Sequence, residues 1–212
     1  MGRIFEKIIN SSSGFFITGT GTDVGKTYFS AILLKYTKGL YFKPIQTGIS
    51  DITVVKEMTK LNENYFSEAC YHFNNPVSPN IAAERENRVI EIDNINLPDS
   101  REHKLLIVEG AGGIYSPISD KHFMIDLIQK FSLPVVIVAE DILGTLNYTI
   151  LTYKALIDIG CNVAFIVLNK YKPSGYNYRC LNEIINKPIL RLPYYNNFPG
   201  ADEIKGVINE SI

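Results

Sequence analysis

Short runs of apolar residues recur along this chain, and each run is nearly unbroken by polar residues. Strands with one face in water alternate apolar and polar residues, whereas strands buried on both faces, as in parallel sheets, do not. The pattern therefore predicts an α/β fold: a doubly wound, mostly parallel sheet with helices on both faces, in three layers. The predicted strands are Phe15–Thr18, Leu40–Phe42, Leu105–Val108, Val135–Ala139, Val163–Leu168 and Ile189–Leu192.

Between these runs, apolar residues recur with the spacing of a helix. From residue 145 to residue 158, Leu146, Ile150, Tyr153 and Ile157 recur at intervals of four, three and four. This spacing predicts one apolar stripe along a helix that packs on the sheet.

The segment from residue 62 to residue 103 has the least regular pattern. It contains Asn-Pro and Ser-Pro turn signals and one short helical stretch, which indicates a helical excursion between two strands. A chain of 212 residues can bury the core of one α/β domain, so residues 1–212 are predicted to form a single domain.

A glycine-rich turn follows the first apolar run and leads into a helical segment. The turn reads Gly-Thr-Gly-Thr-Asp-Val-Gly-Lys-Thr from Gly19 to Thr27. In such a turn, backbone N–H groups and the positive end of the helix dipole face a polyphosphate. Lys26 would reach the outer phosphates, and the Thr27 hydroxyl would bind Mg²⁺. The sequence therefore predicts a phosphate-binding loop, and residues 1–212 are predicted to be a single P-loop NTPase-like domain.

The spacing within this loop is unusual. Five residues separate Gly19 from Gly25, where the common phosphate loop has four. A dinucleotide-binding turn would need its third glycine where Val24 stands. A junction that uses glycine only for its positive φ is the remaining alternative, and it leaves Lys26 and Thr27 unexplained.

Polar residues follow other predicted strands at the edge where ligands bind to a parallel sheet. Lys43 follows the second run and would add a positive charge beside Lys26, which suits phosphoryl transfer to an oxygen nucleophile. Glu109 follows the third run and, with Asp51, is a candidate ligand of Mg²⁺. Local sequence leaves one alternative open for each residue: Lys43 as a surface lysine, Glu109 as a solvated loop acid and Asp51 as a helix N-cap.

A second candidate for nucleotide contact follows the fifth run. Asn169-Lys170-Tyr171-Lys172 partly resembles the Asn-Lys-x-Asp motif of guanine-specific GTPases. Lys172 replaces the aspartate that would recognise guanine, so no guanine selectivity is predicted, and Asn169 remains a candidate for contact with a base.

Composition and charge exclude several function classes. The formal net charge is −1 with 20% charged residues, so no basic surface for nucleic acid or an anionic membrane is expected. No apolar run approaches the roughly 20 residues of a membrane span. The first ten residues lack the apolar core of a signal peptide, so a cytoplasmic location is expected. The three cysteines have no spacing typical of a zinc or redox site.

Taken together, these segments resemble the dethiobiotin synthetase family from residue 15 to about residue 195. The Lys-Pro-Ile-x-(Thr/Ser)-Gly motif and the Glu-Gly-Ala-Gly-Gly motif make the resemblance specific, because the phosphate loop alone is widespread. The matching segments are residues 18–27, 41–48, 108–119, 143–147 and 192–194.

The resemblance implies an ATP- and Mg²⁺-dependent ring closure. The diamine 7,8-diaminopelargonate takes up CO₂ as a carbamate, and ATP phosphorylates the carbamate to a carbamic–phosphoric mixed anhydride. The neighbouring amine then closes the ring and releases dethiobiotin, ADP and phosphate. The resemblance further implies a homodimer in which the second subunit holds the substrate carboxylate at a helix N-terminus.

Roles follow from the resemblance residue by residue. Lys26 and Lys43 would be the catalytic residues that hold the carbamate and the transferring phosphate, and Thr27, Asp51 and Glu109 would coordinate Mg²⁺. The implied substrate-binding residues are Thr22, Thr47 and, from the second subunit, Thr145, Leu146 and Asn147. The implied nucleotide-binding residues are Asp23, Val24, Gly25, Lys26, Thr27, Glu109, Gly110, Ala111, Gly112, Asn169, Lys170, Pro193, Tyr194 and Tyr195.

Three other classes are alternatives, and the first two of them share a loop of this kind. Ligases that amidate cobyrinate-type acids usually carry a glutamine-amidotransferase domain, and none is expected here. Partition-type ATPases usually place a second lysine early in the loop, where this chain has Gly19 and Thr20. A nucleotide-dependent switch would not need a carbamate site such as Lys43 and Thr47.

The chain departs from the family at three places. Asp51 follows Lys43 more closely than is typical, Lys170 differs from better-known members, and only residues 196–212 follow Tyr195. We therefore expect loose selectivity for the nucleobase, with similar turnover rates and KM values for ATP, GTP and CTP. A preference for ATP of about a hundredfold in steady-state kinetics would contradict this expectation.

Overall fold

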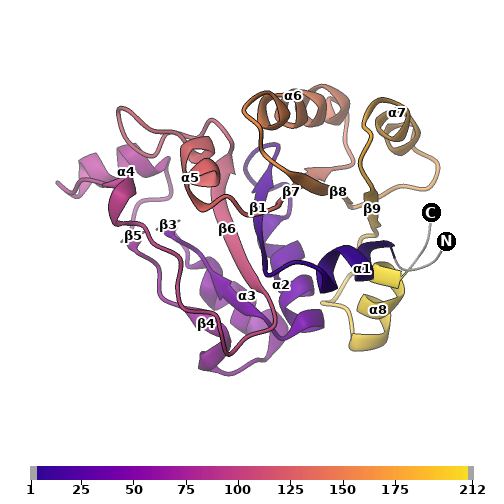
Figure 1. The fold of residues 1–212 in the computed structure, drawn as a ribbon, viewed down its shortest axis with the longest axis horizontal. Helices are drawn as coiled ribbons and strands as arrows, with labels where there is room; N and C mark the ends of the chain where they lie inside the picture. Colours follow the sequence, from indigo (N-terminus) through magenta and orange to yellow (C-terminus); the bar gives the residue numbers. More distant parts are fainter. Residues whose placement is uncertain (1–3, 210–212) are drawn as a thin grey trace.

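The computed structural model describes residues 4–209 and contains a seven-stranded sheet in the order β4-β2-β6-β1-β7-β8-β9 (Figure 1). Every neighbouring pair of strands in it is parallel, which confirms the predicted doubly wound architecture. The strands are β1 (Gly14–Gly19), β2 (Leu40–Phe42), β4 (Phe66–Ser67), β6 (Leu106–Gly113), β7 (Val135–Glu140), β8 (Val163–Asn169) and β9 (Ile189–Leu192). A second sheet pairs β3 (Ile45–Thr47) with β5 (Tyr71–Phe73), also in parallel.

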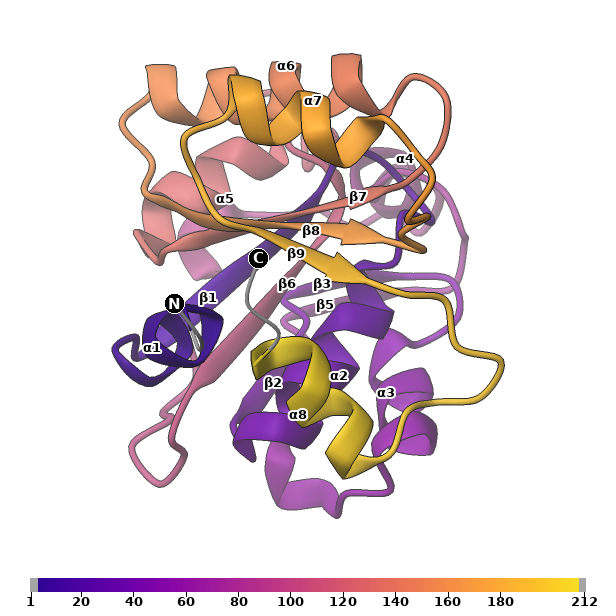
Figure 2. The same ribbon diagram turned by 90° about the vertical axis from the view of Figure 1, so that its right-hand side faces the viewer.

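Helices cover both faces of the main sheet (Figure 2). On one face lie α1 (Ile4–Asn10), α2 (Lys26–Thr37), α3 (Asp51–Thr59) and α8 (Ala201–Asn209). On the other face lie α4 (Pro79–Arg85), α5 (Met124–Phe131), α6 (Thr145–Asp158) and α7 (Asn177–Ile184). Two short 3₁₀ helices, η1 (Glu63–Tyr65) and η2 (Ile92–Asn94), belong to the excursion before β6. None of the helices in residues 4–209 combines the length and apolarity that a membrane span requires.

The unbroken apolar runs are explained by these two covered faces. On β1, Phe15 and Ile17 pack into the core on the α2 side, while Phe16 packs into the core on the α5 side. On the α2 side, the ring of Phe165 packs edge-on against two other rings, with centroid distances of 5.8 Å to Phe15 and 6.1 Å to Phe29. Because successive side chains of a strand point to opposite faces, both odd and even positions must be apolar.

The predicted stripe on α6 is confirmed at three of its four positions, because Leu146, Ile150 and Tyr153 are partly buried and pack against the core. The buried positions are Thr145, Thr149, Thr152 and Leu156, whereas Ile157 is 40% exposed. The most buried face of α6 therefore carries three threonines, and the apolar stripe packs beside it. The spacing of apolar residues alone could not indicate this, because threonine is a polar residue.

The third predicted strand is too short. We expected it to end at Val108 with Glu109 and its glycines in the following loop, but β6 continues to Gly113. Parallel pairing with β1 extends to Gly19 opposite Gly113, after a register shift between Ile17 and Gly19. Glu109, Gly110, Ala111 and Gly112 are therefore held by the sheet.

The segment before β6 is a scaffold for one strand of the site. Its β4 extends the main sheet beside β2, and its β5 pairs with β3, which directly follows Lys43 and Pro44. Two further backbone bonds, from Gly48 N to Phe73 O and from Tyr71 N to Pro44 O, fix this pairing at both ends.

Candidate active site

The phosphate loop joins β1 to α2 and contains two residues in the left-handed region. Asp23 has φ 60° and Gly25 has φ 99°. A Cβ on Gly25 would lie 2.1 Å from Asn169 Nδ2, so only glycine fits there. Asn169 Nδ2 donates a hydrogen bond to Val24 O at 3.0 Å, which ties the loop to the end of β8. The amide of Asn169 is thus a support of the loop.

Lys26 is the first residue of α2 and is buried, at 7% exposure. Its Nζ donates to Gly21 O at 2.8 Å, so the ammonium lies over the loop. Burial, together with the nearby positive charge of Lys43, lowers the pKa of Lys26 to about 8.

Lys43 lies at the end of β2 and is also buried, so the surface-lysine alternative is wrong. Its Nζ lies 2.7 Å from Asp51 Oδ2 and 3.0 Å from Glu109 Oε1, and it donates to Gly110 O at 2.9 Å. Burial by itself lowers the pKa of Lys43, but the charges of Glu109 and Asp51 outweigh burial and hold this pKa above its ordinary value.

Glu109 is fully buried, so the solvated-acid alternative is wrong as well. Its Oε2 accepts a hydrogen bond from Tyr41 OH at 3.0 Å, and its Oε1 accepts one from Thr27 Oγ1 at 2.8 Å. Burial, reinforced by the charge of Glu109, raises the pKa of Tyr41 well above its usual value. Tyr41 therefore remains a donor to Glu109.

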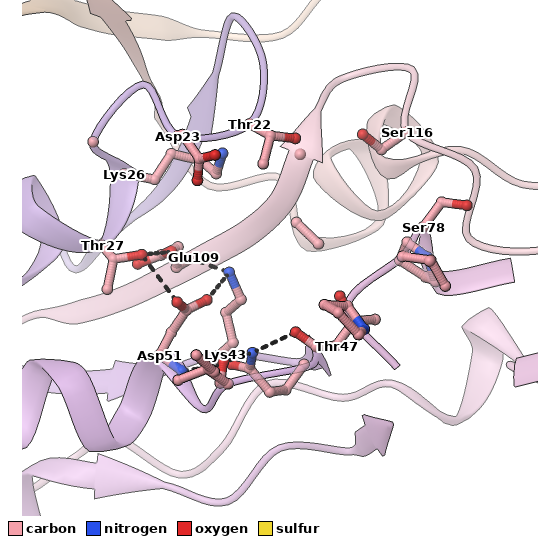
Figure 3. Close-up of a pocket in the computed structure, with 18 of the residues that line it drawn as sticks. Thr22, Asp23, Lys26, Thr27, Lys43, Thr47, Asp51, Ser78, Glu109 and Ser116 are labelled. Carbon is pink, nitrogen blue, oxygen red and sulfur yellow. Dashed lines mark hydrogen bonds and ion pairs between the residues drawn. The ribbon is translucent and has the colours of Figure 1, made fainter. Parts of the chain in front are cut away.

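Asp51 opens α3 but does not cap it. Ser50 is the N-cap, so the interpretation of Asp51 as an N-cap is wrong. The carboxylate of Asp51 points toward Thr27 and Lys43 (Figure 3), with Oδ1 3.2 Å from Thr27 Oγ1. Glu109, Thr27 and Asp51 thus converge on one point from β6, α2 and α3.

These three side chains fit the donor set of Mg²⁺. Within residues 4–209, no group of three or more His, Cys, Asp or Glu side chains could hold a metal alone. Mg²⁺ usually takes one or two carboxylates and completes its shell with water and phosphate oxygens, and two carboxylates plus a hydroxyl meet that requirement. The site could therefore hold Mg²⁺ together with a phosphate.

A cavity of about 730 Å³ joins this cluster to the predicted substrate residues. Thr22 and Thr47 line it, as do Lys26, Thr27, Lys43, Asp51 and Glu109 (Figure 3). The structure thus brings together the catalytic and metal candidates and the two substrate candidates from the same chain.

Several lining residues were missed by sequence reasoning. Ser116 Oγ accepts from Gly113 N at 2.9 Å, and a Cβ on Gly112 would lie 2.0 Å from that oxygen. The excursion before β6 adds the sequence Pro-Val-Ser-Pro at residues 76–79. The Ser-Pro turn signal of Ser78 and Pro79 located a turn, but nothing in the sequence placed it at the cavity.

Four of the predicted nucleotide residues, Asp23, Gly25, Ala111 and Gly112, also line this cavity, whereas the residues predicted for the base and for the second subunit lie outside its lining. Thr145, Leu146 and Asn147 begin α6, outside its lining. Lys170 forms an ion pair with Glu140 at 2.8 Å, and Tyr194 is 67% exposed. Tyr28, which does line the cavity, packs edge-on against Phe198 with ring centroids 5.8 Å apart. The segment after β9 therefore reaches the start of α2.

Comparison with known proteins gives three kinds of match: a family model, curated proteins and solved structures. A family model described as an AAA domain matches residues 13–197. Among curated proteins, an ATP-dependent dethiobiotin synthetase BioD of Lawsonia intracellularis is 40% identical over 163 residues, covering 77% of this chain and 78% of that protein. A protein of the same name from Clostridium perfringens is 33% identical over 214 residues, covering 92% of both chains.

Solved structures match more distantly. A ParA family ATPase from Chlorobium tepidum superposes with a TM-score of 0.55 at 13% identity, covering 94% of this chain and 88% of that one. At this identity the likeness shows a shared P-loop NTPase fold.

The lowered pKa of Lys26 predicts proton uptake when a phosphate binds. A bound phosphate favours the ammonium form, so its pKa rises on binding and affinity weakens as the pH rises above 8. Calorimetry with metal-free ADP in buffers of different ionisation enthalpy should show little proton uptake at pH 7 and most of one proton at a pH well above 8.

Lys26→Arg is the matched control for this measurement, because an arginine stays charged throughout the range. It should bind ADP without proton uptake. Uptake by the wild type that does not change between pH 7 and pH 9 would contradict the assignment.

Proposed function

The chain belongs to the dethiobiotin synthetase family, ATP-dependent cyclo-ligases of biotin biosynthesis, and on that premise we propose that it closes the ureido ring of dethiobiotin from 7,8-diaminopelargonate, CO₂ and ATP. One observation carries the proposal: Lys26 and Lys43 meet two carboxylates and a hydroxyl at one cavity that Thr47 also lines. We further propose that residues 1–212 act as a single P-loop NTPase-like domain.

The proposed chemistry has three balanced steps. One amine of the diamine attacks CO₂, forms a C–N bond and loses a proton, which gives a carbamate. A carbamate oxygen then attacks the γ-phosphorus of ATP, the bond to the bridging oxygen breaks, and ADP leaves. The second amine attacks the carbonyl of this mixed anhydride, forms a C–N bond and loses a proton; the ring closes, and phosphate leaves with the C–O bond pair.

Lys26 and Lys43 supply the positive charge for the second step. Phosphoryl transfer needs positioning and charge neutralisation more than a strong base. Both ammonium groups are buried, where an electrostatic interaction is stronger than in water. Thr27, Asp51 and Glu109 would hold Mg²⁺, which neutralises phosphate charge when bound.

Thr22 and Thr47 would bind the diamine–carbamate end of the substrate. Thr47 ends β3, whose pairing with β5 fixes its backbone, and Thr22 lies in the phosphate loop. Asp23, Val24, Gly25, Gly110, Ala111 and Gly112 would contact the nucleotide from the loop and from β6. Asn169, Lys170 and the segment from Pro193 to Tyr195 would lie nearer its base.

The start of α6 would receive the substrate carboxylate across a homodimer. Thr145 is buried, and its Oγ1 has no hydrogen-bond partner within the described part of the chain. Around it, Leu143 is fully exposed, and Tyr148 and Leu151 are 53% and 59% exposed. Apolar side chains grouped at a helix N-terminus suit contact with a second copy of the chain.

A nucleotide-dependent switch is the alternative function. ADP release by purified protein with Mg-ATP and bicarbonate, with and without the diamine, separates the two. A synthetase releases ADP only when the diamine is present, and diamine-independent release would favour a switch.

Replacing Lys43 by Gln should lower the rate of dethiobiotin formation by about a hundredfold or more, because it removes a buried charge aimed at the transferring phosphate. It should also lower the free energy of unfolding, because Glu109 and Asp51 lose their shared cation. Lys7→Gln, on the exposed side of α1, should change neither quantity. A normal rate in Lys43→Gln would overturn the catalytic assignment.

Subunit mixing tests the shared site. Lys43→Gln and Asn147→Asp should each be inactive alone, the second because its charge repels the substrate carboxylate. After both chains are coexpressed, half of the dimers are mixed and carry one intact site, so about a quarter of wild-type activity should return. No recovered activity in mixtures shown to contain mixed dimers would place both residues in the site of one chain.

A further inference from the structure

The connection between the substrate strand and the metal candidate is short. Thr47 ends β3 and Asp51 begins α3, so only residues 48–50 lie between them. Both Thr47 and Asp51 line the same cavity. The backbone of this connection must therefore be held in one conformation for Asp51 to reach the cluster around Lys43.

The side chain of Gln46 holds this connection along its whole length. Its Nε2 donates to Thr47 O at 3.1 Å and to Ile49 O at 2.6 Å. Its Oε1 accepts from Asp51 N at 2.9 Å. Gln46 is buried at 3% exposure, where these bonds do not compete with bulk water.

This bonding leaves Gln46 little capacity for a ligand. Both hydrogens of its amide are donated to backbone carbonyls, and its oxygen accepts from a backbone N–H. The reverse orientation of the amide would place its oxygen against two carbonyl oxygens, so the network defines the orientation. Although Gln46 lines the cavity, its polar atoms serve the backbone of the connection.

Asp51 depends on Gln46 at the start of its helix. The first N–H groups of a helix have no partner within the helix, and Gln46 Oε1 satisfies that of Asp51. The cap bond from Thr53 N to Ser50 Oγ is longer, at 3.4 Å. With its backbone held in this position, Asp51 has its Oδ2 2.7 Å from Lys43 Nζ and its Oδ1 3.2 Å from Thr27 Oγ1.

We infer that Gln46 is a positioning residue for the divalent cation: its amide places Asp51, and through Asp51 it sets the affinity for the ion. The inference rests on the proposed function only for the assignment of Asp51 as a metal ligand. This role of Gln46 explains how a connection of only three residues brings Asp51 to Thr27 and Lys43.

The test measures Mn²⁺ binding to the ADP-bound protein by electron paramagnetic resonance, so it does not need the catalytic reaction. Gln46→Met keeps the length of the side chain and removes its three bonds; it should weaken Mn²⁺ binding about tenfold. Affinity for metal-free ADP should stay within about twofold, because Gln46 does not support the phosphate loop. Gln129→Met, the same change on the exposed side of α5, should alter neither affinity.

A double-mutant cycle separates positioning from general structural damage. Asp51→Asn alone should weaken Mn²⁺ binding, and Gln46→Met added to it should weaken binding no further, because both act through one carboxylate. If Gln46→Met did not fold, Gln46→Asn, which is one methylene too short to reach Asp51 N, should give the same loss. Wild-type Mn²⁺ affinity in a folded Gln46 variant, or full additivity with Asp51→Asn, would overturn the inference.

The two proposals fail separately in these experiments. A protein that makes no dethiobiotin but shows the predicted Mn²⁺ cycle keeps the role of Gln46 and loses the proposed reaction. An active synthetase whose Gln46 variants bind Mn²⁺ normally keeps the reaction and loses the role of Gln46.

Discussion

The candidate site depends on one buried ion cluster. Lys43 shares its ammonium between Asp51 and Glu109, and Glu109 also accepts bonds from Tyr41 and Thr27. Removing one partner from a buried ion pair leaves a charge without compensation, which costs several kcal/mol, roughly 3–5. The end of β2, the middle of β6 and the starts of α2 and α3 must therefore keep their relative positions. The cluster contributes to function by bringing those four elements together, more than by adding stability.

The need to hold these elements in place also explains the excursion before β6. A three-residue strand such as β3 has too few bonds to hold its place alone, and β5 supplies a parallel partner over its whole length. Thr47 then occupies a fixed position at the cavity, and Gly48, with φ 69°, turns the chain toward Asp51. A Cβ on Gly48 would lie 2.7 Å from Pro76 Cβ, so the excursion packs against the turn that it supports.

Much of this could be predicted from sequence, and the limits have physical causes. The six main strands and the phosphate loop follow local rules: unbroken apolar runs, and glycines before Gly-Lys-Thr. Pairings such as β3 with β5 depend on residues far apart in the chain, and three-residue strands carry no period of their own. The roles of Lys43, Glu109 and Asp51 were ambiguous locally, because burial decides between a surface charge and a site charge. The sequence does not indicate the role of Gln46, because its hydrogen-bond partners are backbone atoms, which are the same for every residue type. On α6 the most buried positions are mostly threonines, which the spacing of apolar residues does not detect, so the predicted stripe lies beside the most buried face.

The unusual spacing of the phosphate loop fits this organisation. The loop is supported from outside itself: Asn169 at the end of β8 holds Val24, and the left-handed Asp23 and Gly25 shape the backbone that leads to Lys26. Gln46 likewise holds the connection to Asp51 from a neighbouring position. In each case a buried side-chain amide fixes a backbone segment, and that segment presents a charged group to the cavity. Charges fixed before the reaction need no reorganisation in the transition state, which is where electrostatic catalysis has its advantage. The extra loop residue is therefore compatible with a rigid site, because β8 restricts the freedom that it would otherwise add.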